Sequence, residues 1–199
     1  MKTVPFIDKT TIRRVIGEQI FKSYPDDSPQ LPLDIEDFVE IRLGIPLHIV
    51  QLHKSILGYA NIEENAIYIN VMIENQQTRF RFTVAHELGH LTLHKDLIQR
   101  EGQFLTTLKQ PLLTSENERR VEYQANLYAG ELLAPIGYIH NLYENRFKAI
   151  MEQVDEKKKI LPASEMVRTV AKDCEVSRSC AVVRLKDYFG NVYPWKLFR

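Results

Sequence analysis

The chain has 199 residues, of which 44% are hydrophobic, enough to bury one substantial core with room for a small appended domain. Lysine plus arginine and aspartate plus glutamate number 26 each, and this balance disfavours a stand-alone nucleic-acid binder or a protein drawn to anionic membranes. No stretch approaches the roughly 18 apolar residues of a membrane span, and residues 1–14 lack the apolar core of a signal peptide, so we expect a cytoplasmic protein without a membrane partner.

The first third of the chain is predicted to contain two helices and a small sheet. Apolar residues at helical spacing indicate a helix over residues 10–24, and Asp34 and Gly44 have the cap positions of a second helix between them. Apolar runs at residues 45–52 and 66–71 are typical of strands, and a turn-like segment separates them. We expect the two strands to pair beside the helix that follows.

That next helix, predicted over residues 78–94, is the most informative segment because it contains a His-Glu-x-x-His motif. His86 and His90 are four residues apart, so on a helix both imidazoles face one side and can reach the same cation. Glu87 follows one step around the helix, where a general base for a water molecule at the metal is needed. The alternative is a core helix whose imidazoles only hydrogen-bond to their neighbours. Two histidines with an intervening glutamate at ligand spacing favour the metal site.

A catalytic metal centre requires a third protein ligand and an open position. His94 lies one turn beyond His90, but about 12 Å of helix axis separates it from His86, too far for one ion, so we interpret it as a supporting or structural residue. Asp96 and Glu101 would need a sharp chain reversal to return to the metal. The further histidine of a metzincin motif is absent. These observations favour a carboxylate from a separate helix.

A suitable carboxylate lies in the next predicted helix, residues 116–133. Ser115 and Glu118 have the spacing of a capping box at its start. Glu122 and Asn126 share one helix face with two alanines, and small residues allow two helices to approach closely. We therefore expect Glu122 to be the third ligand and Asn126, one turn further on, to fix its orientation. The alternative is a solvated surface glutamate.

The rest of the chain is predicted to be mainly helical. A long loop joins the two motif helices, and further helices are indicated over residues 136–148 and 151–159, with a boundary at Pro162. Two short helices over residues 164–174 and 177–188 resemble a helix-turn-helix.

That C-terminal segment raises the question of DNA binding. Residues 163–189 hold five basic and four acidic residues, a balance that favours a structural or repressor-docking role over direct phosphate binding. The two cysteines, Cys174 and Cys180, fit neither a disulfide framework nor a Cys-x-x-Cys pair and are expected to be buried thiols. Three basic residues of the segment have positions from which they could address DNA: Arg178, Arg184 and Lys186.

Two segments carry a resemblance to a known family. They are Arg-Phe-Thr-Val-Ala-His-Glu-Leu-Gly-His at residues 81–90 and Glu-Tyr-Gln-Ala-Asn-Leu-Tyr-Ala-Gly-Glu-Leu-Leu-Ala-Pro at residues 122–135. Together they are similar to the ImmA/IrrE metallopeptidases, and the resemblance covers residues 30–135. Ala134 is a departure, since the family often has methionine there, and this difference should affect packing more than chemistry.

The resemblance implies a role for each motif residue. In the family, the first segment carries two zinc-binding histidines and the catalytic glutamate, and the glutamate of the second segment is the third ligand. Here these positions correspond to His86, His90, Glu87 and Glu122. We expect Zn²⁺ as the cofactor, and Mn²⁺ or Fe²⁺ would also suit two imidazoles and one carboxylate.

The resemblance over residues 30–135 and the helix-turn-helix-like pattern after residue 160 together indicate a fold. We expect an α+β protein in which a mainly helical, zincin-like peptidase core with a small β-sheet is followed by a C-terminal helix-turn-helix-like helical segment. The metallopeptidase domain would span residues 1–150, with a gluzincin-like core at about residues 30–135, and the C-terminal segment residues 160–199. Residues 67–71 are the candidate edge strand for binding an extended substrate, with a plain core hairpin as the alternative.

The implied function is that of a zinc-dependent endopeptidase whose partner and substrate is a helix-turn-helix transcriptional repressor. Cleavage would derepress genes of a mobile element or a stress response. One alternative is a DNA-binding or repressor-binding regulator whose metal site is a sensor. Another is a toxin-antitoxin component with a structural zinc site, although such a site needs no base like Glu87. Five tyrosines are candidates for stabilising the oxyanion: Tyr59, Tyr68, Tyr123, Tyr128 and Tyr138.

Overall fold

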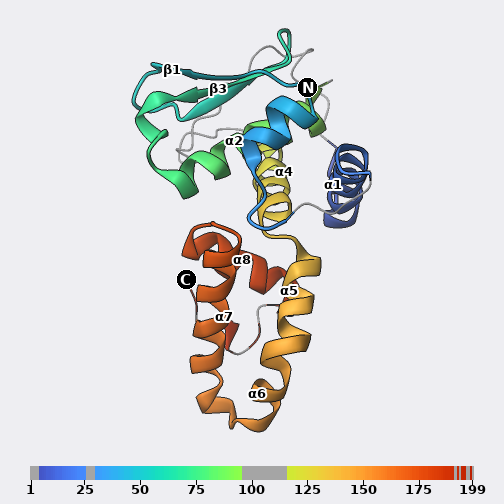
Figure 1. Cartoon of the computed structure of the whole chain (residues 1–199), viewed down its shortest axis with the longest axis vertical. Helices are drawn as coiled ribbons and strands as arrows, with labels where there is room; N and C mark the ends of the chain where they lie inside the picture. The colour runs from blue at the N-terminus through green and yellow to red at the C-terminus, as the bar shows by residue number, and fades with distance from the viewer. Residues whose placement is uncertain are drawn as a thin grey trace. The chain divides into compact units, whose positions relative to one another are not determined.

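The structure is a computed structural model that describes residues 5–25, 30–95 and 116–190, together with residues 192, 194, 195 and 198. The chain divides into two compact units, Met1–Ala129 and Gly130–Arg199, and the boundary falls within helix α4 (Glu116–Leu133) (Figure 1). The predicted division between residues 150 and 160 stays a prediction. The expected α+β class is confirmed, because helices predominate and the described residues include a three-stranded sheet.

The first two helices of the structure lie where the sequence predicts them. Helix α1 (Lys9–Ser23) confirms the first predicted helix. Asp34 caps the second by accepting a hydrogen bond from the amide of Asp37 at 3.0 Å, and that helix continues as the π-helix η1 (Asp37–Arg42). Gly44 follows with a φ of 63°, a backbone conformation that favours glycine at the end of a helix.

The sheet contains β1 (Leu47–Val50), β2 (Gly58–Asn61) and β3 (Ala66–Asn70). β3 is central, parallel to β1 and antiparallel to β2. The two predicted strands are confirmed as β1 and β3. The proposal that residues 67–71 form a substrate-binding edge is wrong, because β3 is already hydrogen-bonded on both sides.

Strand β2 occupies the segment that was predicted to be turn-like, and Gly58 explains the error. A Cβ atom at Gly58 would lie 2.9 Å from the carbonyl oxygen of Tyr68 and 3.0 Å from the side chain of Thr83. The strand therefore needs a glycine to approach β3 and the helix beneath it. Glycine within a sequence pattern indicates a turn more often than a strand, so the pattern was misleading.

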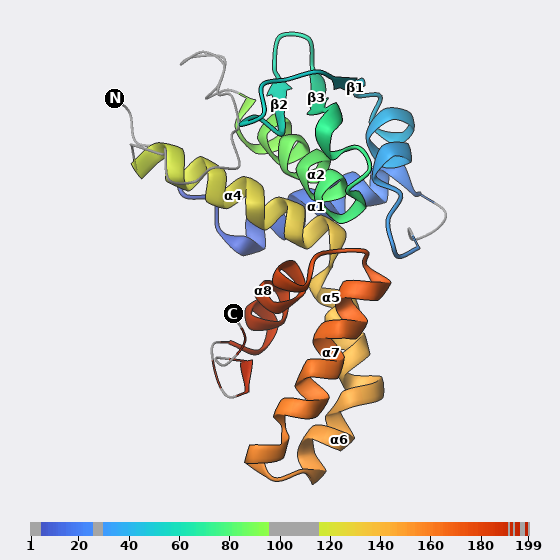
Figure 2. The same cartoon turned by 90° about the vertical axis from the view of Figure 1, so that its left-hand side faces the viewer.

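Helix α2 (Gln77–Leu93) carries the histidine motif and contacts both the sheet and α4 (Figure 2). The contact with α4 is close, since a Cβ atom at Gly89 would lie 3.2 Å from the Cα atom of Ala125. Five apolar side chains of this helix are themselves buried: Phe80, Val84, Ala85, Leu88 and Leu91. The motif thus lies in the core of the first unit.

After the end of α4, the second unit continues with α5 (Ile136–Leu142), the π-helix η4 (Tyr143–Phe147) and α6 (Lys148–Gln153), which follow one another as a single rod (Figure 1). The helix predicted over residues 151–159 is confirmed only in part, since residues 151–153 are the end of α6. The chain becomes extended directly after α6 and then forms only the short 3-10 helix η5 (Glu156–Lys158).

Helix α7 (Ile160–Asp173) runs back along this rod, and the Tyr138 hydroxyl of α5 donates to Asp173 at 2.7 Å. Pro162 was predicted to mark a boundary, but it lies in the first turn of α7, where the missing N–H costs no helical hydrogen bond. Helix α8 (Arg178–Phe189) follows. Buried residues join α7 to α8: Met166, Val167, Val170, Ala181, Val182 and Leu185.

Both cysteines are free thiols. Cys174 is buried, as predicted, whereas Cys180, also predicted to be buried, is half-buried. Among the described helices, none is both long enough and apolar enough to cross a membrane.

Candidate metal centre

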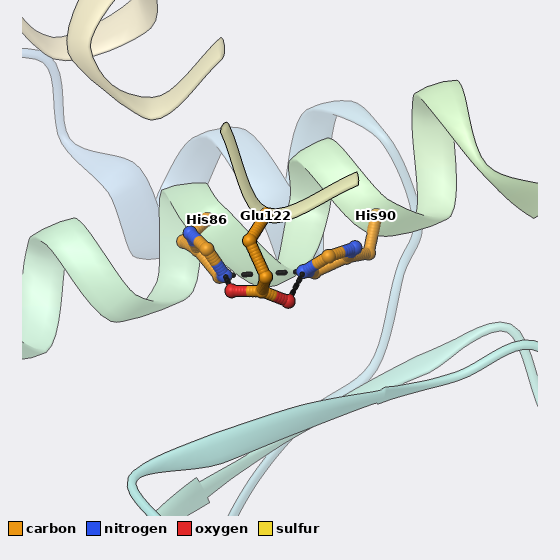
Figure 3. A group of neighbouring side chains, drawn as sticks. All are labelled: His86, His90 and Glu122. Atoms are coloured by element: carbon orange, nitrogen blue, oxygen red, sulfur yellow. Dashed lines mark hydrogen bonds and ion pairs between the residues drawn. The ribbon is translucent and has the colours of Figure 1, made fainter. Parts of the chain in front are cut away.

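The two histidines of α2 and a glutamate of α4 bring their ligand atoms together (Figure 3). The Nε2 atoms of His86 and His90 are 3.0 Å apart. One carboxylate oxygen of Glu122 lies 3.3 Å from His86 Nε2, and the other lies 3.2 Å from His90 Nε2. All three ligand atoms lie within 4.8 Å of one another, which suits coordination of a single ion. Asp96 and Glu101 lie outside the described residues.

The packing of α2 on α4 explains how Glu122 reaches the histidines. Ala125 and Ala129 are fully buried, so the small-residue face of α4 lies inside the unit, as expected. Gly89 of α2 packs directly against Ala125 on this face of α4. The histidine side chains are 1% exposed and that of Glu122 is 12% exposed, so bulk water has little access to the donors.

The charges of the three residues depend on one another. Burial raises the pKa of Glu122, but its contacts with His86 and His90 outweigh this effect and lower that pKa to about 2. Burial lowers the pKa of His90 to about 4. Burial also lowers the pKa of His86, but its hydrogen bond to Glu122 and the charge of Glu87 outweigh this effect, so the net shift is upward. Glu122 is therefore a carboxylate and His90 a neutral imidazole, the states that metal binding requires.

Asn126, which was expected to orient Glu122, contacts one of the two candidate histidine ligands. Its Oδ1 atom lies 3.1 Å from Nδ1 of His86, so its hydrogen bond joins α4 to the histidine. Because Asn126 is four residues after Glu122 on α4, both side chains project toward α2 from the same face. Asn126 thus supports the ring of a candidate ligand.

His94 lies next to His90, on the side of the His90 ring away from Glu122. This position fits the supporting or structural role that was expected for it. Its Nδ1 atom is 3.2 Å from Nδ1 of His90, and its Nε2 atom is 2.9 Å from Oε1 of Gln124. Burial lowers the pKa of His94. Gln124 is fully buried, yet no sequence argument identified it. A position two residues after Glu122 on a helix lies on a different face, so sequence spacing carried no signal for Gln124.

Glu87 is 1% exposed and lies next to His86 on α2. Its negative charge contributes to the upward shift of the pKa of His86, the preceding residue on α2. The structure therefore brings His86, Glu87, His90 and Glu122 into one buried region.

The five tyrosines that could stabilise the oxyanion differ in whether their hydroxyl groups donate to a neighbouring side chain. Tyr68, Tyr128 and Tyr138 donate their hydroxyls to Glu64, Gln19 and Asp173, respectively. Tyr138 also belongs to the second unit. These bonds favour Tyr59 and Tyr123, one on β2 and the other beside Glu122 on α4, as the remaining candidates.

The three basic residues considered for DNA binding all have partners within the second unit. Arg184 is 2% exposed and donates to the Glu131 carboxylate, to Asp187 at 2.8 Å and to the Ala134 carbonyl at 3.0 Å. The Lys186 ammonium donates to the carbonyl of Phe198 at 2.7 Å, and the Arg178 guanidinium lies over the ring of the same residue. Arg184 is buried and so cannot contact DNA from this position.

The donor set fits a divalent transition metal. Two imidazole nitrogens and one carboxylate are the number and kind of protein ligands in many catalytic zinc sites, and Mn²⁺ and Fe²⁺ accept the same donors. The helical core, the small mixed sheet and this donor set together define a zincin-like metallopeptidase fold.

Comparison with known proteins identifies the family. The model of the Peptidase_M78 family, described as the IrrE N-terminal-like domain, matches residues 42–186, and the chain belongs to this family. It is also 27% identical over 135 residues to the "Uncharacterized immunity region protein 2" of Bacillus phage phi105, covering 68% of this chain and 75% of the relative. The resemblance to the ImmA/IrrE metallopeptidases is thereby confirmed.

A solved structure described as a Mycobacterium tuberculosis transcriptional regulator has a similar fold. The TM-score is 0.53 at 15% sequence identity, and the match covers 89% of this chain. It covers only 46% of the regulator, so the chain spans less than half of that protein's length. At this level of identity the likeness concerns the fold alone.

Proposed function

We propose that the protein is a zinc-dependent endopeptidase in which His86, His90 and Glu122 hold the ion and Glu87 is the general base. The observation that carries the proposal is the approach of the three ligand atoms, from two packed helices, to within 4.8 Å of one another. Glu87 supports it further, because a structural metal site does not need a buried carboxylate beside its ligands.

The reaction assigned to this site is hydrolysis of a peptide bond. When bound, zinc would supply a Lewis acid that polarises the scissile carbonyl and lowers the pKa of water to about 7. Glu87 accepts a proton from the water molecule as its oxygen bonds to the carbonyl carbon. The C–N bond then breaks, and Glu87 returns the proton to the departing nitrogen. The peptide consumes one water molecule and yields a carboxylate and an amine.

For the substrate, we propose a helix-turn-helix transcriptional repressor. The proposal is supported by membership of the IrrE N-terminal-like family and by the likeness to a phage immunity-region protein. Because β3 is central, an extended segment of the repressor would have to pair with β1 or β2. We favour β2, which packs against the helix that carries Glu87.

The alternative of a DNA-binding regulator is weakened by the contacts of Arg184, which is buried among Glu131, Asp187 and Ala134. A repressor-binding regulator that uses the metal site as a sensor is still compatible with these contacts. The toxin-antitoxin alternative gains no support from the phage relative, whose name refers to immunity.

A comparison of the wild-type protein with Glu87→Gln tests the proposal. Each form is expressed in the source cells, and intact helix-turn-helix proteins and new protein termini are quantified by mass spectrometry. We expect one such protein to acquire a new terminus only with Glu87 present, while the purified variant keeps its metal. Loss of metal in the variant would contradict the role of Glu87. Altered transcripts without any cleavage in both forms would support the sensor alternative instead.

A further inference from the structure

The proposed zinc site, on which this inference rests, extends beyond its ligands through a chain of hydrogen bonds. His90 Nδ1 lies 3.2 Å from His94 Nδ1, and His94 Nε2 lies 2.9 Å from Gln124 Oε1. The amide nitrogen of Gln124 then donates to the Pro5 carbonyl oxygen at 3.2 Å. His94 is 2% exposed and Gln124 is fully buried, so water cannot readily replace these partners. The chain links one candidate ligand to the N-terminal backbone.

The proton positions along this hydrogen-bond chain follow from its far end. A backbone carbonyl only accepts, so the amide nitrogen of Gln124 must face Pro5 and its oxygen must face His94. His94 Nε2 therefore carries the proton that it donates to Gln124, and His94 Nδ1 is left as an acceptor. The remaining contact, at 3.2 Å, requires the proton on His90 Nδ1. His90 Nε2 is then left with its lone pair.

We infer that Gln124 is a positioning residue for the metal centre: through His94, it fixes His90 in the tautomer whose Nε2 atom can bind zinc. Nε2 is also the atom that lies beside Glu122 in the donor cluster, at 3.2 Å. Histidine ligands commonly donate their other ring N–H to a carboxylate or a carbonyl. Here a second histidine takes that place, and it can accept a proton at Nδ1 only when a partner holds its proton at Nε2.

The other candidate ligand shows why Gln124 matters to one histidine and not to both. His86 Nδ1 lies 3.1 Å from the amide oxygen of Asn126, an atom that can only accept a hydrogen bond. His90 instead faces an imidazole, which is an acceptor in one tautomer and a donor in the other. Without Gln124, His94 can place its proton on Nδ1. Two N–H groups would then face each other, and His90 would have to turn or move its proton to Nε2.

Gln124→Met tests the inference because it keeps the length of the side chain and removes both hydrogen-bonding groups. The matched control is Gln19→Met in the same unit, where the amide bonds to Thr92 at 3.2 Å and accepts from the Tyr128 hydroxyl. Zinc affinity is measured by competition with a chromophoric chelator. The tautomers of His86, His90 and His94 are measured by long-range proton–nitrogen correlation spectra of the zinc-loaded proteins.

In the wild-type protein we expect His94 to carry its proton on Nε2, and both ligand histidines on Nδ1. Gln124→Met should change the His94 tautomer and weaken zinc binding by about 10- to 100-fold, the usual effect of losing such a partner. Gln19→Met should change neither. Gln124→Glu, which keeps an acceptor for His94, should restore the His94 tautomer and recover much of the affinity. The thermal midpoint of each variant shows whether a change in affinity follows only from lost stability.

A wild-type His94 with its proton on Nδ1 would overturn the inference, as would a Gln124→Met protein with unchanged tautomers and zinc affinity. Equal losses of affinity in Gln124→Met and Gln19→Met would also overturn it, because the effect would then be one of general stability. A protein that binds zinc as described but cleaves no repressor would contradict the proposed function and leave the inference standing. Failure of the wild-type protein to bind zinc would overturn both.

Discussion

Gly89 of α2 and Ala125 of α4 are so close that a Cβ atom on the glycine would stand 3.2 Å from the Ala125 Cα atom. The same added atom would stand 3.2 Å from the Cβ atom of Tyr128. Glu122 lies three residues before Ala125 on the same helix and must reach His90 across this contact. The glycine therefore controls how far the third candidate ligand is from the histidines.

We predict that Gly89→Ala destabilises the protein and weakens metal binding. Alanine improves intrinsic helix propensity by up to about 1 kcal/mol, but an extra carbon in a packed core costs about 1–3 kcal/mol and pushes the helices apart. Urea denaturation of the metal-free protein and zinc titration measure the two effects. Gly17→Ala in α1 is the control, because an added Cβ there meets nothing within 4 Å. Similar behaviour of both variants would show that the close helix contact is unimportant.

The assignment of Glu122 as a ligand predicts that Glu122→Ala loses most of its zinc. Two imidazoles remain in that variant, which is one protein ligand fewer than catalytic zinc sites normally use. Metal content after dialysis, measured by mass spectrometry, gives the result directly. Glu116→Ala is the matched control, because Glu116 lies on the same helix with a side chain that is 72% exposed. Unchanged zinc in Glu122→Ala would return Asp96 or Glu101 as the third ligand.

The donor cluster was predictable because its geometry is set by regular helices. His86 and His90 share a face at a spacing of four residues, and Glu122 could be chosen from the small residues that accompany it on its own helix. The cap at Asp34 was equally predictable, since Asp34 acts on a residue three positions away. Local spacing alone decides each of these features.

Features that depend on distant partners were not predictable. Gln124 is one polar residue on a helix until folding brings it to His94, 30 residues earlier, and to Pro5, 119 residues earlier. Arg184 has a position typical of an exposed basic residue on a recognition helix. In the structure its guanidinium is buried and donates to the carboxylate of Glu131, 53 residues earlier. Sequence spacing carries no signal of such pairings without information from related chains.

The contact between Glu131 and Arg184 predicts a large loss of stability when either partner is removed. Their side chains are 9% and 3% exposed, and the other oxygen of Glu131 accepts from the Ile136 amide at 3.0 Å. Arg184→Met would leave a buried carboxylate without its cation, which typically costs about 3–5 kcal/mol. Urea denaturation measures the change. The double variant Glu131→Gln, Arg184→Met should lose less than the sum of the two single variants.

An exposed ion pair in the same unit provides the control for this prediction. Arg146 lies 3.8 Å from Glu165, with side chains that are 56% and 37% exposed. Arg146→Met should therefore cost less than about 1 kcal/mol. Comparable losses for Arg146→Met and Arg184→Met would show that burial does not strengthen the internal pair.

Cys180 gives the last prediction, which concerns pH. Burial raises the pKa of its thiol from 9.0 to about 11, so at pH 8 the thiolate fraction in the folded protein is lower than in the unfolded chain by about 100-fold. Alkylation of Cys180 by iodoacetamide at pH 8 should be slower in native than in denatured protein by about 10- to 100-fold, because the thiolate of a thiol with a higher pKa is rarer but more nucleophilic. Mass spectrometry of the labelled peptide measures the two rates.

The same shift makes stability depend on pH in a defined window. A raised folded-state pKa favours the folded state fully below pH 9, and this contribution is lost as the pH rises from 9 towards 11, because only the unfolded thiol ionises readily there. Urea midpoints measured between pH 8 and pH 11 should fall more steeply for the wild-type protein than for Cys180→Ala. Parallel curves for the two proteins, or equal alkylation rates in the native and denatured states, would show that the thiol is not shielded as its contacts indicate.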